Sequence, residues 1–210
     1  MKKTLFAAAV VAAFTFSACS ENNTENAEAT AEMHEGMDHD DMATDEAEGA
    51  VVVETPDYSN VAEPLKTQVS QLVDQYMKLT DALVASDAAA AKAAANEVLT
   101  VAKAMPIATL TTDEKAFAEE KTAVVVDNAT KIANSEDLGA QRENLQPLSE
   151  AVFSMAKAFD AADETLYYQY CPMAFNNKGA YWLSSNEEIR NPYFGDAMLS
   201  CGSNKEVFKK

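Results

Sequence analysis

Two short runs near the carboxyl end of the chain place a methionine close to a cysteine. The first is Cys171-Pro172-Met173, and the second begins at Met198 and ends at Cys201. If the runs meet in the fold, two thiolates and two thioethers would surround one ion, and such soft ligands select Cu(I) or Ag(I). The residues therefore predict a metal site formed by Cys171, Met173, Met198 and Cys201.

Two other interpretations of these runs stay open. A disulfide between Cys171 and Cys201 would close a loop of about 30 residues and stabilise the fold by ~3.5 kcal/mol. Met173 and Met198 would then be core-filling side chains, a common use of the flexible thioether. Neither run matches a closed zinc pattern built from two Cys-x-x-Cys pairs.

A further group of soft ligands lies in the acidic amino-terminal part of the chain. It consists of Met33, His34, Met37, His39 and Met42, and its two histidines are all that the protein has. Thioether and imidazole bind Cu(I) and Ag(I), and imidazole with carboxylate also binds Cu(II). We predict that this group captures and relays ions. The alternative is a solvated spacer in which these side chains have no role.

The sequence contains no arrangement typical of a catalytic site. It has no glycine-rich phosphate loop and no serine in a nucleophile-elbow context. Because both histidines belong to the acidic segment, a general base would have to be a carboxylate on a solvated helix face. We therefore expect a binding protein and not an enzyme, with Cu(I) or Ag(I) as its ion and no cofactor firmly implied.

Residues 1–18 have the pattern of a lipoprotein signal peptide. Two lysines precede a twelve-residue apolar run, residues 5–16, which is too short to span a bilayer. Small residues at positions 17 and 18 precede Cys19, an arrangement that resembles the bacterial lipobox. We predict lipidation at Cys19 and a lipid-anchored protein of the cell envelope, in the outer membrane and facing the periplasm or the cell exterior. A secretory signal that leaves Cys19 as a free thiol is the alternative.

Charge narrows the range of partners. The formal net charge is −18, which repels nucleic acid and anionic membrane surfaces. The membrane is therefore expected to contact this protein through the lipid anchor only. Residues 19–57 are acidic and poor in apolar side chains, which predicts a disordered tether between the anchor and a folded part.

Residues 58–165 predict a helical bundle. Apolar side chains at steps of three and four mark one helix over residues 61–83, and an alanine-rich helix is expected over residues 88–105, where Pro106 stops it. A third helix is expected over residues 111–134. A fourth carries Leu145 to Phe159, and Pro147 lies in its first turn or kinks it. The pattern favours an up-down four-helix bundle in a mainly α fold.

Residues 166–210 differ from the bundle because aromatic side chains replace the alanines and glycines mark tight turns. We expect an irregular, aromatic-rich cap with short strands, packed on the bundle and carrying the Cys/Met runs. Its aromatic residues are Tyr167, Tyr168, Tyr170, Phe175, Tyr181, Trp182, Tyr193, Phe194 and Phe208.

Three short motifs of the cap resemble those of a known family. The motifs Cys171-Pro172-Met173, Asn191-Pro192-Tyr193-Phe194-Gly195 and Met198-Leu199-Ser200-Cys201-Gly202 resemble those of an uncharacterised helical-bundle lipoprotein family that is also fused to periplasmic adaptor subunits of heavy-metal efflux systems. The resemblance covers residues 66–205. It implies a Cys/Met-bearing carboxyl-terminal part, a role in copper or silver handling, and components of heavy-metal efflux as partners.

Taken together, the sequence predicts an exported lipoprotein that binds Cu(I) or Ag(I) for sequestration or for delivery to an efflux system. The alternative is a non-metal interaction or scaffold domain of the cell envelope that is stapled by a disulfide between Cys171 and Cys201.

Overall fold

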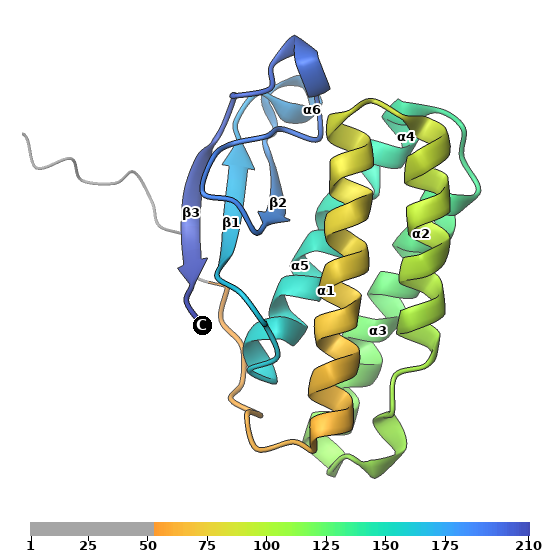
Figure 1. Ribbon diagram of the computed structural model, residues 1–210, viewed down its shortest axis with the longest axis vertical. Helices are drawn as coiled ribbons and strands as arrows, with labels where there is room; N and C mark the ends of the chain where they lie inside the picture. The colour runs from red at the N-terminus through yellow and green to blue at the C-terminus, as the bar shows by residue number, and fades with distance from the viewer. Residues whose placement is uncertain (1–52) are drawn as a thin grey trace, which may run out of the picture. The chain divides into compact units, whose positions relative to one another are not determined.

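Apolar side chains on the first predicted helix lie in the core of the computed structural model, which describes residues 53–210 (Figure 1). Helix α1 (Glu63–Val84) buries Val69, Leu72, Leu79 and Leu83 along one face, as the spacing predicts. The predicted signal peptide, the lipidation site Cys19 and the Met/His group of residues 33–42 lie outside the described residues. No helix among residues 53–210 has a stretch long and apolar enough to cross a lipid bilayer.

Helices α2 (Ala88–Lys103) and α3 (Thr112–Ala133) begin at side-chain caps. The Asp87 carboxylate accepts a hydrogen bond from the backbone N–H of Ala90 over 2.9 Å, and Thr111 with Glu114 forms a capping box. Such caps satisfy N–H groups that a first helical turn leaves unpaired. Between these helices a 3₁₀ turn, η1 (Ile107–Thr109), follows Pro106. The small buried side chains of α2 let it pack closely between α1 and α3.

The predicted fourth helix begins at Leu145 as expected, and a short helix that the sequence did not predict precedes it. Helix α4 (Leu138–Glu143) ends at Asn144, and α5 (Leu145–Ala158) begins next to it with Pro147 in its first turn. Proline is tolerated there because first-turn N–H groups have no helical partner. The mainly helical fold is confirmed, whereas the up-down order of four helices stays a prediction.

A three-stranded antiparallel sheet follows the helices, so the predicted short strands are confirmed. Its order is β2-β1-β3, with β1 (Leu166–Cys171) between β2 (Ala180–Ser184) and β3 (Ser203–Phe208). In Figure 1 the sheet lies beside α1 and α5. Two further turns, α6 (Ala174–Asn177) and the 3₁₀ turn η2 (Gly195–Ala197), belong to the connections between the strands.

The two faces of the sheet have different neighbours. On one face, the ring of Tyr168 stacks on Phe153 of α5 at a centroid distance of 4.9 Å. Side chains alternate along a strand, so Gln169 and Cys171 of β1 lie on the other face, together with Trp182 of β2. Residues 185–202 cover that second face: the carbonyl of Asn186 accepts a hydrogen bond from Gln169.

Val53, the first residue that the structure describes, contacts α5 and β3. The Lys157 ammonium donates a hydrogen bond to the Val53 carbonyl and pairs with the Glu206 carboxylate, which also accepts a hydrogen bond from the Val53 N–H. Lys157 and Glu206 are both mostly buried. This group joins the chain entering the domain to α5 and to β3.

Tyr76 links α1, α5 and the sheet. Its buried hydroxyl donates to Ser149 Oγ over 2.6 Å, since the Ser149 hydroxyl gives its own proton to the Leu145 carbonyl, and it accepts from the Leu183 N–H over 3.1 Å. The Leu183 bond satisfies a backbone group at the outer edge of β2. Burial raises the pKa of Tyr76 to about 12.

We expect Tyr76→Phe to lower the free energy of unfolding by about 1–3 kcal/mol, because it leaves the buried Leu183 N–H without an acceptor. Denaturant unfolding measures the change, and Tyr167→Phe at a partly exposed position of β1 is the matched control.

The ordinary tyrosine pKa is 10.0 and that of folded Tyr76 is about 12, so between these pH values unfolding releases the Tyr76 proton. Stability attributable to Tyr76 should therefore fall as pH rises from 10 to 12, and equal losses in both variants would contradict the assignment.

Candidate functional site

The two cysteines of the cap meet. Cys171 ends β1 and is buried, Cys201 is partly exposed before β3, and their Sγ atoms share a hydrogen bond over 2.8 Å. The Cys201 sulfur also accepts a hydrogen bond from the backbone N–H of Met173. The hydrogen bond to Cys171 and, after it, burial raise the pKa of Cys201 to about 11. At neutral pH Cys201 is therefore a protonated thiol that a metal ion would have to deprotonate.

Strand pairing produces this contact. Strands β1 and β3 are antiparallel neighbours, and Tyr170 is paired with Ser203. Cys171 follows Tyr170 by one residue, and Cys201 precedes Ser203 by two. The register therefore brings the end of β1 and the approach to β3 to the same point, although about 30 residues separate the cysteines in the chain.

Asn191 fixes the loop that carries Cys201 through hydrogen bonds to its backbone. Its side chain is fully buried, donates to the Cys201 carbonyl over 2.8 Å and accepts from the Tyr193 N–H over 2.8 Å. Its own N–H donates to the Leu199 carbonyl. In the sequence, Asn191-Pro192-Tyr193-Phe194-Gly195 stands out only as one of the motifs that carry the resemblance, so the hydrogen bonds of Asn191 to the Cys201 loop were not predicted. Their signal was an asparagine placed before proline in an aromatic turn.

Both predicted methionine ligands line one cavity. Met173 and Met198 share a space of about 500 Å³ with aromatic side chains of the cap and with α4. Met173 is 45 % exposed, whereas Cys171 is fully buried, so the soft side chains extend from the surface to the interior. The cavity is also lined by Gly139, Arg142, Glu143, Phe175, Asn176, Asn177, Tyr193 and Phe194.

A left-handed turn follows Met173. Phe175, Asn176 and Asn177 in and beside α6 have φ angles of 50°, 59° and 65°, a conformation that costs a non-glycine residue roughly 1–2 kcal/mol. The turn places the Phe175 ring against Tyr193 at a centroid distance of 5.3 Å. Tertiary packing therefore offsets the backbone strain and holds one wall of the cavity.

Two further residues frame the Cys/Met site. Trp182 is buried and packs edge-on against Tyr193 at a centroid distance of 5.9 Å. It lies so close to Gly202 that a β-carbon at that position would come within 2.8 Å of the Trp182 ring.

Arg142 of α4 donates hydrogen bonds to the carbonyls of Pro192 and Leu83, which joins the cap to the end of α1. Burial lowers the pKa of Arg142.

The candidate centre is thus two thiols in contact and two thioethers on one adjoining cavity. Among residues 53–210, no group of three or more His, Cys, Asp or Glu side chains is placed to hold a metal ion.

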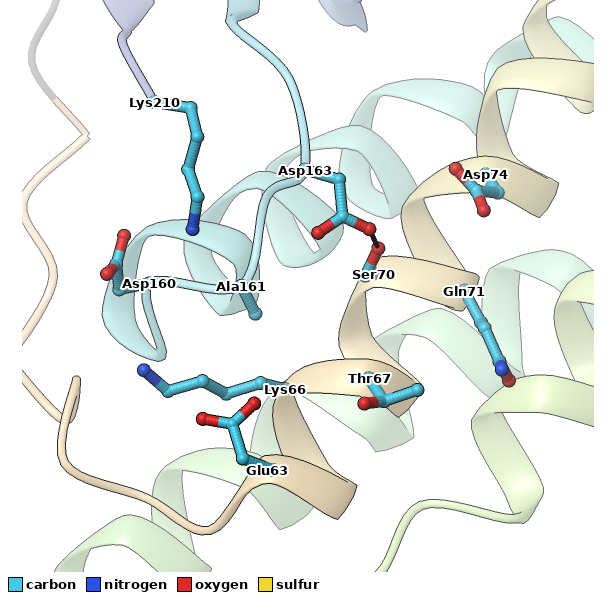
Figure 2. Close-up of a pocket in the computed structure, with 10 residues that line it drawn as sticks. All are labelled: Glu63, Lys66, Thr67, Ser70, Gln71, Asp74, Asp160, Ala161, Asp163 and Lys210. Atoms are coloured by element: carbon cyan, nitrogen blue, oxygen red, sulfur yellow. Dashed lines mark hydrogen bonds between the residues drawn. The ribbon is translucent and has the colours of Figure 1, made fainter.

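A second cavity, of about 380 Å³, has a different character. Figure 2 shows its oxygen- and nitrogen-bearing side chains on α1 and on the connection between α5 and β1, together with Lys210. The Ser70 hydroxyl donates to the Asp163 carboxylate, and no ion pair within residues 53–210 joins the cavity's lysines to its carboxylates. Hard oxygen ligands of this kind do not select soft ions.

The comparisons with known proteins concern the helical part. The model of a family described as "Protein of unknown function (DUF3347)" matches residues 72–164. The chain is similar to that family over its helices. The match is consistent with the uncharacterised domain that the resemblance implied, and it ends before β1, so it does not include the Cys/Met runs. No curated protein and no solved structure matches the chain.

We expect Cys171→Ala to speed alkylation of Cys201. Removing the hydrogen-bond partner lowers the pKa of Cys201 from about 11 toward its ordinary 9.0, and only the thiolate is a nucleophile. Iodoacetamide rates across pH 7–10 on reduced protein measure the shift, with Cys19→Ser in every variant to remove the third thiol. Met198→Leu, which leaves the thiol pair intact, is the control. Identical pH profiles in all variants would show that the thiols do not interact in solution.

Proposed function

We propose that this protein is an exported lipoprotein, lipidated at Cys19, that binds Cu(I) or Ag(I) and sequesters the ion or delivers it to an efflux system. The observation that carries the proposal is the contact of Cys171 with Cys201 beside a cavity lined by Met173 and Met198. The two thiols come from distant parts of the chain, and the backbone N–H of Met173 donates to the Cys201 sulfur, which links the thiol pair to the cavity that Met173 and Met198 line. Packing alone does not require two thioethers to share a cavity next to two thiols.

The ligand types favour a monovalent soft ion. Thiolate and thioether sulfur bind Cu(I) and Ag(I) well, while Mg²⁺ and Ca²⁺ require oxygen ligands. Two thiolates around a monovalent ion leave one net negative charge. The cavity that Met173 and Met198 line also contains Arg142 and Glu143, whose formal charges cancel.

The tether and the anchor complete the proposal. The group formed by Met33, His34, Met37, His39 and Met42 would collect ions with weak, exchangeable ligands, and the Cys/Met site would hold them more tightly. Components of a heavy-metal efflux system are the proposed partners. The protein acts by binding and not by catalysis.

The test is a competition titration with Ag(I) against a chromogenic chelator. The parent chain carries Cys19→Ser and serine at the five tether positions, so that Cys171 and Cys201 are its only thiols and the tether has no soft ligands. We expect one Ag(I) per reduced chain. Cys171→Ser or Cys201→Ser should weaken binding by about a hundredfold, equivalent to about 2.7 kcal/mol.

Thioether roles are tested separately in the same parent. The double variant Met173→Leu/Met198→Leu should weaken Ag(I) binding by about tenfold or more, whereas Met77→Leu on α1 should leave it unchanged. Cysteine variants that bind Ag(I) as tightly as the parent would refute the proposed site.

Binding should depend on pH because ligation displaces thiol protons. Since the pKa of Cys201 is raised to about 11, its proton is present throughout pH 6–8 and must leave when the ion binds. Release of that proton makes apparent affinity rise by about tenfold per pH unit. Titrations at pH 6, 7 and 8 measure the slope, and Cys201→Ser should reduce it by one proton. A slope that this substitution does not change would argue against thiolate ligation by Cys201.

The same sulfur contact favours a second function. At 2.8 Å the thiols are close enough for a small movement to join them, which would staple an interaction or scaffold domain of the envelope. Under this alternative, protein purified without reductant contains one intramolecular disulfide, and the reduced parent chain binds no Ag(I). Stoichiometric Ag(I) binding would exclude it.

A further inference from the structure

We propose that the Cys171–Cys201 pair reduces Cu(II) to Cu(I) and that Met173 and Met198 retain the Cu(I) that is formed. The inference rests on the proposed function and adds a redox step to the same site. Its observations are the contact between the two thiols, their unequal exposure, and the position of the two thioethers on the adjoining cavity.

The step balances with Cu(II) as the oxidant. Two Cu²⁺ ions each accept one electron and become Cu⁺. The S–H bonds of Cys171 and Cys201 break, one S–S bond forms between the two sulfur atoms, and two protons pass to solvent. The reaction occurs once per reduced chain and needs an external thiol to be repeated, so it is a stoichiometric activity.

Geometry favours closure within one chain. The sulfur atoms are 2.8 Å apart, and a disulfide bond has a length of about 2.05 Å, so closure requires a movement of less than about 1 Å. Cys201 lies on the partly exposed loop before β3, where a dissolved ion can reach it, whereas Cys171 is buried at the end of β1. The accessible thiol meets the ion, and the buried thiol completes the bond.

Product retention follows from ligand chemistry. Thioethers carry no proton and are not consumed when the thiols form a disulfide, so Met173 and Met198 remain ligands after the reaction. They prefer Cu(I) to Cu(II), which binds imidazole and carboxylate better. Met173 is 45 % exposed at the mouth of the cavity, where it can take up the ion as the Cys201 sulfur releases it. Reduction thus converts an ion that the cavity binds poorly into one that it binds well.

The experiment adds Cu(II) to the reduced parent chain without oxygen and follows Cu(I) with bicinchoninate. We expect two Cu(I) per chain, complete loss of free thiols, and a monomer mass lower by two hydrogen atoms. Cys171→Ser and Cys201→Ser should each form Cu(I) at least about tenfold more slowly, since a single thiol can close a disulfide only with a second chain. Single-cysteine variants that match the parent in rate and yield would overturn the inference.

Retention is measured without the chelator, by copper content and oxidation state after gel filtration. The parent should keep Cu(I), and Met173→Leu/Met198→Leu should produce the same two Cu(I) but lose them on the column, while Met77→Leu behaves as the parent. If the double methionine variant retains Cu(I) equally, the retention step is wrong. Ag(I), which these thiols do not reduce, separates the two proposals: Ag(I) binding without Cu(II) reduction overturns only this inference, whereas absence of Ag(I) binding overturns the proposed function.

Discussion

The pairing of β1 with β3 is the constraint on which the Cys/Met site depends. The pairing brings Cys171 and Cys201 to one point after an irregularity in the register between Tyr168 and Gln169, and a shift of one residue would turn Cys171 to the opposite face of the sheet. The helices stabilise that register from the other face. The Phe153–Tyr168 stack fixes β1 against α5, and the Tyr76 hydroxyl fixes the edge of β2 through Leu183. The helical layer therefore acts on the thiols through the sheet, without contacting them.

Polar side chains tie the second face of the sheet to the segment that covers it, although the buried Oε1 of Gln169 and the buried Nε1 of Trp182 have no hydrogen-bond partner among the described residues. The side-chain amide of Asn191 donates one hydrogen bond to, and accepts one from, the backbone of residues 193–201. The Arg142 guanidinium donates hydrogen bonds to carbonyls of the cap and of α1. Buried polar networks of this kind specify one arrangement, because a partner lost on either side leaves an unpaired group in the interior. The Cys201 loop is thus anchored at both ends: by Asn191 before it and by the start of β3 after it. Met198 belongs to this anchored loop, and the opposite wall of the cavity is the strained turn at Phe175.

Sequence patterns predicted the parts of this arrangement that depend on local rules. The buried face of α1 follows from apolar side chains at steps of three and four residues, and the end of α2 follows from Pro106. The sequence left open whether Cys171 and Cys201 meet; in the structure their sulfur atoms are 2.8 Å apart, and Met173 and Met198 line one cavity. Metal binding there stays a prediction. The role of Asn191 and the left-handed residues 175–177 could not be predicted, because each depends on a neighbour supplied by a distant part of the chain. Helix α4 was also not predicted, because its six residues are too few to show an apolar periodicity.

The same fold can hold the two thiols in three ways, because each way closes the same loop. A hydrogen bond, a bridging metal ion and a disulfide would all hold the ends of the same chain segment of about 30 residues together. Closing such a loop covalently removes conformational entropy from the unfolded chain equivalent to about 3.5 kcal/mol, and a tightly bound ion restricts it in a similar way. Because β1–β3 pairing and Asn191 already place both ends, the native backbone has little to change between these states. Under the proposed function, the two sulfur atoms would therefore change between these states while the sheet, the helices and the methionine cavity remain in place.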